Sequence, residues 1–506
     1  MPNSITSQGS TQVGVQTQTK AESFNVTVVS SRPPLATIQS SAEIRHMVNE
    51  EVGIIEVLPD QQSPLGKMSI YNPPKNFARL VVCVLWCFNV GFSDAAPGAL
   101  LPHIEKYYGT NYAVTSCIWI SNAMGFIVVA ALSHKIQPWL GKRMSMTFGC
   151  FLSSIMYAIV SSGTVFPVVV IGFFFGGAGV AIVLSQSNVF IARLEKASKY
   201  LSFFHGFYGI GATISPLLGT LMVSHGVPWH YFYLILLGLM ITSCASFFWT
   251  FEGADEDLKP WDIDESNNNN NDGNMAAIEL EQIGSSETTD DPVRKSNDMS
   301  LMADALRNRV TWLIAFFCLF YQGSEVSIAG WIVSFLLDYR HGNPNTVGYA
   351  ASGFWGGLTI GRLLLARPLH VHVGGRRSVI IVSLIAIILM ALVWAIDNIF
   401  AEAVLVAIAG IFIGPNYTLL IAYTASERLL PRKIQVISLT IMTAFGSSGG
   451  ALFPFLVGLL SEKVGTFVVL PVFIALYTSM VILWICLPNI ENRSGNNKQT
   501  LWDKFW

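Results

Sequence analysis

Twelve apolar runs of about 20 residues each dominate this sequence and leave few folds open to it. They lie at about 80–102, 114–133, 144–164, 166–190, 201–224, 230–250, 311–337, 347–368, 378–397, 402–426, 435–460 and 467–487. A helix rises about 1.5 Å per residue, so each run matches the hydrocarbon core of a bilayer. Charged residues make up 12% of the chain, half the share of about 25% in soluble proteins. The sequence therefore predicts an all-α, multi-pass membrane protein and excludes a soluble enzyme, a disulfide-stapled secreted domain and a nucleic-acid-binding protein.

The polar residues that the spans lack are collected in three segments. Residues 1–77 are rich in Ser, Thr and Gln and predict a disordered cytoplasmic tail with no cleaved signal peptide. Residues 251–309 hold fifteen of the 32 acidic residues and a run of asparagines, which predicts an acidic cytoplasmic linker. Residues 488–506 predict a cytoplasmic C-terminal tail. Between these segments, residues 78–250 and 310–487 predict two six-helix bundles.

The positive charges of the short loops predict how the helices are oriented. The loops after spans 2, 4, 8 and 10 carry twelve Lys and Arg residues, whereas the opposite loops carry three. Positively charged loops stay in the cytoplasm, so we expect both termini and the linker there. We also expect a monomer in the lipid bilayer, in the plasma membrane rather than a vacuolar or endosomal membrane.

The two blocks repeat one another at three similar offsets. An offset of 232 places Gly91 on Gly323 and Gly98 on Gly330, an offset of 234 places Gly141-Lys142-Arg143 on Gly375-Arg376-Arg377, and an offset of 238 places Gly172, Gly176 and Gly211 on Gly410, Gly414 and Gly449. The pattern predicts a duplicated six-helix unit. This arrangement resembles the major facilitator superfamily, which implies a solute site near the bilayer midplane between the halves.

Two carboxyl groups lie in the middle of predicted spans. Asp94 in the first span and Glu325 in the seventh occupy nearly equivalent positions of the repeat, and Pro97 predicts a bend beside Asp94. An ionised carboxylate there costs about 2.5–3.5 kcal/mol on insertion scales unless a partner, water or a proton lowers the cost. Because proton coupling requires a carboxyl that alternates between charged and neutral forms, both residues are candidates for it. The alternative is that each only bonds a neighbouring helix.

Amides, hydroxyls and aromatic rings in the spans are candidates for binding a neutral polyhydroxy solute. These candidates are Asn89, Gln186, Asn188, Tyr321, Gln322, Trp331, Asn416 and Tyr417. Tyr321 and Gln322 lie one turn before Glu325, so the three form a polar stripe on one helix. The same groups also join helices through hydrogen bonds of about 0.6 kcal/mol each, and the sequence supports this alternative equally for Gln186, Asn188 and Asn416.

A further set of residues is assigned to gating or structure. Arg362 lies in the cytoplasmic third of the eighth span, where we expect a gate or an anchor at the membrane surface, with neutralisation of a carboxyl as the alternative. His205 lies near the start of the fifth span and is expected to bond a helix end rather than relay a proton. The loops after spans 2 and 8 contribute Gly141, Arg143, Gly375 and Arg377. The seven cysteines fall in apolar runs and no phosphate-binding loop is found, so no metal, cofactor or ATP is expected.

A closer resemblance is carried by residues 321–331, YQGSEVSIAGW, and residues 205–219, HGFYGIGATISPLLG. They resemble the seventh and fifth spans of fucose-permease-like facilitators, a group with fungal members and with animal sodium/glucose-transporter-like proteins. The resemblance implies sugar/proton symport supported by an aspartate in the first span and a glutamate in the fourth. Asp94 is similar to the aspartate, but Leu184 stands where the glutamate is expected. The asparagine run and long tails are typical of a fungal protein.

The leading hypothesis is a secondary transporter that moves a small polar solute, for example a sugar, by alternating access and with H⁺ as its coupling partner. A proton-driven drug or metabolite antiporter is a close alternative, because residues 211–219 partly resemble an antiporter motif. A non-transporting nutrient receptor that signals through its tails is another. A membrane-embedded enzyme is not expected, since no nucleophile–base pair lies in or beside the spans.

Overall fold

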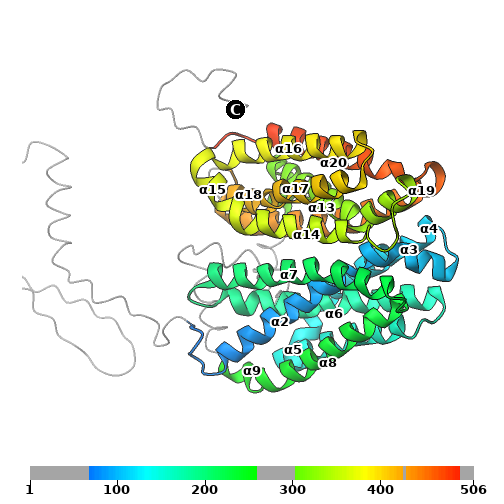
Figure 1. Ribbon diagram of the computed structural model, residues 1–506. Helices are drawn as coiled ribbons and strands as arrows, with labels where there is room; N and C mark the ends of the chain where they lie inside the picture. Colours follow the sequence, from blue (N-terminus) through cyan, green and yellow to red (C-terminus); the bar gives the residue numbers. More distant parts are fainter. Residues whose placement is uncertain (1–67, 259–301, 425–428, 491–506) are drawn as a thin grey trace, which may run out of the picture. The chain divides into compact units, whose positions relative to one another are not determined.

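Helices form nearly all of the chain that the structure describes. The computed structural model describes residues 68–258, 302–424 and 429–490 (Figure 1). Most of the predicted N-terminal tail, linker and C-terminal tail lies outside these ranges, and so does Arg428 of the tenth loop. The described start of the predicted linker contains a short helix, α9 (Ala254–Asp257).

The helices of the first block occupy the places that the apolar runs predict. The helices α2 and α3 form the first span, α5 forms the second and third, and α6, α7 and α8 form the fourth to sixth. Their bounds are α2 Asn76–Asp94, α3 Ala96–Tyr108, α4 Tyr112–Thr115, α5 Cys117–Ser161, α6 Phe166–Ala192, α7 Ala197–Ser224 and α8 Phe232–Thr250, with a 3₁₀ turn at Trp229–Tyr231.

The second block has the same order of spans. The seventh is α13 and the eighth contains α14 and α15, followed by α16, then by α17 with α18, then by α19 and α20. Their bounds are α13 Arg309–Ser334, α14 Tyr349–Ile360, α15 Ala366–Pro368, α16 Gly375–Ala395, α17 Ile399–Ile413, α18 Pro415–Thr424, α19 Arg432–Val464 and α20 Val469–Cys486, with a 3₁₀ turn at Thr466–Val468 and a π-helical turn at Phe335–Tyr339.

Eleven helices in the described ranges are long and apolar enough to cross a membrane. The eighth span differs because two π-helical turns, Gly361–Leu365 and Leu369–Val373, interrupt it. A π-helical turn accommodates an extra residue and frequently marks a functional position. Arg362 lies in the first of these turns. The all-α, multi-pass prediction is confirmed, and each of the twelve predicted spans is helical in the part that the structure describes.

The first span breaks where Pro97 predicts a bend. Helix α2 ends at Asp94 and α3 begins at Ala96, so Ala95 separates them. Pro97 lies in the first turn of α3, where a proline needs no hydrogen-bond partner for its nitrogen. The break therefore places the Asp94 carboxyl at a helix end inside the bundle rather than within an unbroken helix.

The predicted repeat is visible where helices cross most closely. Gly211 of α7 packs against the backbone of Phe88 in α2, and Gly449 of α19 packs against the backbone of Leu319 in α13. In both places an added Cβ would overlap a carbonyl oxygen, so only glycine allows the helices to lie this close. Two glycines matched by the offset of 238 thus make equivalent contacts in the two halves.

The match of the fourth span to the tenth was wrong by several residues. Gly410 packs against the backbone carbonyl of Phe354 in α14. The equivalent contact in the first half is made by Gly177 against Asn122 in α5, and not by Gly172, which meets a side chain. The correct offset is therefore 410 − 177 = 233. Residue identity alone is ambiguous in glycine-rich helices, and the backbone contacts remove the ambiguity.

The loops after the second and eighth spans are also equivalent at an offset of 233, not 234. Gly141 and Gly374 both have positive φ, at 71° and 96°, which favours glycine. Arg143 donates to a backbone carbonyl at the end of α8, and Arg376 donates to two at the end of α20. Arg376 is therefore the counterpart of Arg143, whereas Arg377 has an exposed side chain.

The loop around Gly141 is held by the short helix that follows the sixth span. The backbone N–H of Lys142 donates to the Asp255 carboxylate at 2.7 Å. A Cβ at Gly141 would lie 2.8 Å from an oxygen of the same carboxylate, so glycine is required here by space as well as by φ. In the second half, Gly375 is the first residue of α16.

Candidate functional site

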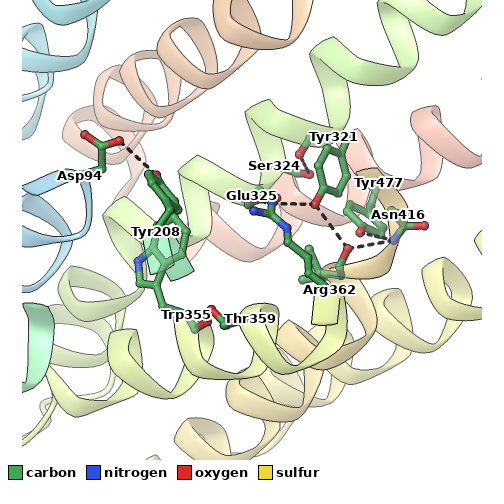
Figure 2. Close-up of polar contacts among 11 residues, drawn as sticks. Asp94, Tyr208, Tyr321, Ser324, Glu325, Trp355, Thr359, Arg362, Asn416 and Tyr477 are labelled. Carbon is green, nitrogen blue, oxygen red and sulfur yellow. Dashed lines mark hydrogen bonds and ion pairs between the residues drawn. The ribbon is translucent and has the colours of Figure 1, made fainter. Parts of the chain in front are cut away.

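The Asp94 carboxyl lies at the break in the first span and faces the fifth. The Tyr208 hydroxyl of α7 donates to Asp94 Oδ2 at 3.1 Å, as Figure 2 shows. Asp94 is exposed, although it lies within the helix bundle. Water can therefore reach this carboxylate inside the protein, which lowers the cost of its charge.

The Glu325 carboxyl is buried and paired with a cation. Nη2 of Arg362 lies 2.8 Å from both of its oxygens, and the same nitrogen donates to the Tyr321 hydroxyl at 3.3 Å. The Glu325 side chain is 8% exposed and that of Arg362 is 30% exposed. The Arg362 side chain is therefore the more solvent-accessible partner of the pair.

Arg362 is placed by the structure as the partner of Glu325. Sequence reasoning favoured a gate or anchor and kept neutralisation of a carboxyl as the alternative. The two residues are 37 positions apart on different helices, and the π-helical turn changes the direction of the Arg362 side chain relative to a regular helix. Neither fact can be read from helical periodicity.

Three of the predicted solute-binding residues are engaged in packing between helices. Asn89 is buried and donates to Ser243 of α8 at 2.9 Å. Asn416 is buried and donates to the Tyr477 hydroxyl of α20 at 2.9 Å. Trp331 is fully buried and its Nε1 donates to the Pro454 carbonyl of α19. A solute can reach these groups only after the helices move.

The other predicted binding residues are divided between the interior and water-accessible positions. Tyr321 is fully buried and stacks on Tyr417, with ring centroids 6.2 Å apart. Asn188 is buried, and its Oδ1 has no hydrogen-bond donor in the described ranges. Gln186 and Gln322 are half-buried, and Gln322 lies against Gly446 of the eleventh span. Tyr417 is half-buried as well, so these three side chains are the ones of the predicted set that keep some exposure.

His205, Tyr208 and Arg362 join Asp94 in one inner cluster. All four lie deep within the protein yet keep some exposure. The Tyr208 ring is within electrostatic range of Asp94, Glu325 and Arg362, and His205 is within range of Arg362. The inner cluster therefore joins residues of both halves around a region that water enters.

Two aromatic residues of this region were missed by the sequence reasoning. Tyr208 lies in the fifth span, one helical turn after His205, and Trp355 lies in the eighth span. Their rings meet edge to face, with centroids 6.3 Å apart. The only signal in the sequence was the position of Tyr208 between Gly206 and Gly209, where small neighbours leave room for a ring and a close helix. No metal-binding group of three His, Cys, Asp or Glu side chains occurs within the described ranges.

The two halves meet at the end of the spans opposite the start of α2 and the end of α20, which we call the distal face. Tyr112 of the first half donates its hydroxyl to Asp338 at 2.8 Å and its backbone N–H to Glu462 at 3.1 Å. Its ring also contacts the Trp331 ring at 5.7 Å between centroids. Trp331 in turn lies against Trp119 of the first half. These contacts join the two halves on the distal side of the inner cluster.

The sequence model of the Major Facilitator Superfamily matches residues 82–342, slightly more than half of the chain. The chain belongs to the major facilitator superfamily. Membership makes it a multi-pass membrane transporter for small molecules, with a lipid bilayer as its surroundings, and it agrees with the resemblance noted in the sequence.

Two known proteins are similar to the chain over most of its length. The Saccharomyces cerevisiae protein named Bypass of stop codon protein 6 is 26% identical over 401 residues, which cover 76% of this chain and 78% of that protein. A crystal structure of the Escherichia coli fucose:proton symporter covers 80% of this chain and 97% of its own, with a TM-score of 0.52 and 12% identity. At this identity the likeness shows a common fold.

Proposed function

We propose that the protein carries a small polar solute, with sugars as the favoured class, across a membrane by proton-coupled alternating access. The observation that carries the proposal is the contrast between the two carboxyls. Asp94 is exposed and has a hydroxyl as its donor, whereas Glu325 is buried against a guanidinium. The water-accessible carboxyl is the one suited to exchanging a proton.

The charges of the inner cluster favour Asp94 over Glu325 as the proton acceptor. Protonating Glu325 would leave the Arg362 guanidinium without its counter-ion in a largely buried place, which is costly. Protonating Asp94 removes a negative charge that is balanced by a hydrogen bond alone. We therefore assign the exchanged proton to Asp94. We propose that the Glu325–Arg362 pair stays ionised, with no net charge, and lines the site.

Polar side chains of the spans that keep some exposure suit a neutral solute with several hydroxyls. His205, Gln186 and Gln322 offer an imidazole and two amides, and each keeps some exposure. Aromatic faces and such donors and acceptors are the usual means of orienting a polar ligand in a pocket. A fucose:proton symporter shares the fold, which supports the sugar class.

Uptake by the purified protein in liposomes tests this proposal. Radiolabelled fucose and glucose serve as the first probes, with the outside made more acidic than the lumen. We expect accumulation that a protonophore abolishes. In Asp94→Asn the rate of accumulation should fall at least about tenfold, which corresponds to a rise of about 1.4 kcal/mol or more in the activation free energy of the rate-limiting step. Asp397→Asn is the matched control, because this carboxyl is largely exposed at the distal face and pairs with Arg340.

The alternatives give different results in the same liposomes. Solute movement in the direction opposite to proton flow would indicate antiport instead of symport. Uptake that equals wild type in Asp94→Asn would contradict the assignment of the proton to this carboxyl. Saturable binding of a probe without flux would instead indicate a receptor.

The closed distal face gives a second prediction. Tyr112→Phe removes the hydrogen bond to Asp338 while the ring contact with Trp331 remains. A hydrogen bond to a charged group contributes about 1.5–3 kcal/mol, and exposure places this one at the lower end. We therefore expect the equilibrium ratio of protein open at the distal face to protein closed there to rise about tenfold.

Labelling of the native Cys117 thiol, close to the Tyr112 helix, measures that opening. A membrane-impermeant thiol reagent should modify Cys117 faster in Tyr112→Phe, after serine replaces the other partly exposed cysteines, Cys244 and Cys486. Tyr107→Phe is the control, because the Tyr107 hydroxyl bonds Gly163 within the first half. Equal labelling rates in the two variants would show that Tyr112 does not hold the face closed.

A further inference from the structure

The fifth span holds a tyrosine that contacts both halves at the depth of the proton site. The Tyr208 hydroxyl donates to Asp94 of the first half. Its backbone lies directly against Gly91 of α2, where a Cβ would overlap its carbonyl oxygen. The backbone at Tyr208 is therefore fixed against the first span, and the side chain is the part that can move.

On its other side, the Tyr208 ring meets the second half. Trp355 of α14 presents an edge-to-face contact, with ring planes at 72°. Trp355 is 4% exposed, and its Nε1 has no acceptor within reach in the described ranges. One turn further along α14, Thr359 packs against Gly209, so the two helices lie close beside this contact. Movement of the Tyr208 ring must therefore be accommodated by the eighth span (Figure 2).

The same eighth span carries the arginine that pairs with Glu325. Arg362 follows Trp355 by two helical turns, in the π-helical turn. A displacement at Trp355 therefore reaches the Glu325–Arg362 pair through one helix. A π-helical turn is a place where a helix can change its register locally.

Protonation of Asp94 changes what the Tyr208 hydroxyl bonds. The titratable and charged groups that face Asp94 and Tyr208 are Cys87 on α2, Tyr157 on α5, Glu325 on α13 and Arg362 in the π-helical turn of the eighth span. When a hydronium ion gives its proton to Asp94, an O–H bond forms on the carboxyl and a water molecule is released. The carboxyl then becomes a donor itself, and the charge-assisted hydrogen bond from Tyr208 is lost.

We infer that Tyr208 is the positioning residue that transmits the protonation of Asp94 to the second half, through its ring contact with Trp355. This rests on the proposed function only in taking Asp94 as the proton acceptor. With Asp94 ionised, the hydroxyl holds the ring between Asp94 and Trp355. With Asp94 protonated, the ring is released, and the packing of the fifth span on the eighth changes.

Infrared difference spectra of the full-length protein between alkaline and acidic buffer test the inference without a solute. Protonation of Asp94 adds a carboxyl C=O band, identified by its absence in Asp94→Asn. In wild type we expect an accompanying change in the amide band from helix movement. In Tyr208→Phe the carboxyl band should remain while the amide change falls at least severalfold. Trp355→Leu should give the same result, because it removes the ring that Tyr208 contacts.

Transport separates the role of Tyr208 from a structural one. Tyr208→Phe keeps the ring and removes the hydroxyl, so we expect solute exchange between two equally buffered compartments to continue while proton-driven accumulation falls about tenfold. Tyr231→Phe, at an exposed tyrosine of the distal face, should match wild type in both assays.

Each negative result in these experiments would overturn a different statement. A full amide change together with the carboxyl band in Tyr208→Phe would overturn the inference and leave Asp94 as the proton site. Absence of the carboxyl band in wild type would overturn both the inference and the assignment of the proton to Asp94. Accumulation in Tyr208→Phe equal to wild type would overturn the inference while the proposed function stands.

Discussion

Replacing Arg362 by methionine should destabilise the protein by about 3 kcal/mol. Breaking a buried ion pair costs about 3–5 kcal/mol, because the remaining charge has no partner. The Arg362 side chain is 30% exposed, and solvent screening places the expected loss at the lower end of that range. Glu325→Gln should cost less, because water can reach the remaining guanidinium more easily than it can reach the Glu325 carboxylate.

Thermal unfolding of the four proteins of a double-mutant cycle in detergent measures this effect. The double variant Glu325→Gln/Arg362→Met should recover a large part of the lost stability, with a coupling free energy of about 1–3 kcal/mol. Arg362→Lys is the control, because it keeps the positive charge and loses the planar fork. Additive losses in the cycle would mean that the pair does not stabilise the fold as a unit.

Alanine at Gly211 or Gly449 should destabilise the protein by about 1–3 kcal/mol, the usual cost of overpacking. At each position the new Cβ would meet backbone atoms of the neighbouring helix at less than 3.0 Å. Since backbone cannot rotate away, the helices must separate. Because the two positions are equivalent in the repeat, the two losses should be similar.

Gly238→Ala should have the opposite effect on the stability of the protein. A Cβ built at Gly238 of α8 meets no atom within 4 Å in the described ranges, apart from its chain neighbours and the backbone of its own helix. Alanine in a helix interior is favoured over glycine by about 0.5–1 kcal/mol. The melting temperature should therefore rise or stay constant in Gly238→Ala and fall in Gly211→Ala and Gly449→Ala. Equal effects at all three positions would show that helix propensity, and not the close crossing, decides the outcome.

The sequence by itself determined the spans and their duplication. Apolar runs of membrane length must be helical, because no water in the bilayer can satisfy a free backbone. Glycine patterns marked the close crossings, such as Gly211 and Gly449, and Pro97 marked the break after Asp94. These signals are local, so each can be read without knowing which helices are neighbours. The scarcity of charge in the spans also singled out Asp94 and Glu325.

The tertiary structure alone decided which groups those carboxyls face. Glu325 meets Arg362 on a different helix, whereas Asp94 meets Tyr208. Helix rotation and a π-helical turn set these meetings, and neither leaves a periodic pattern in the sequence. The same holds for Asn89, Asn416 and Trp331. The sequence predicted that they bind a solute, whereas in the structure they form hydrogen bonds between helices. Two carboxyls that are nearly equivalent in the repeat thus have different partners, because the residues opposite them were not duplicated.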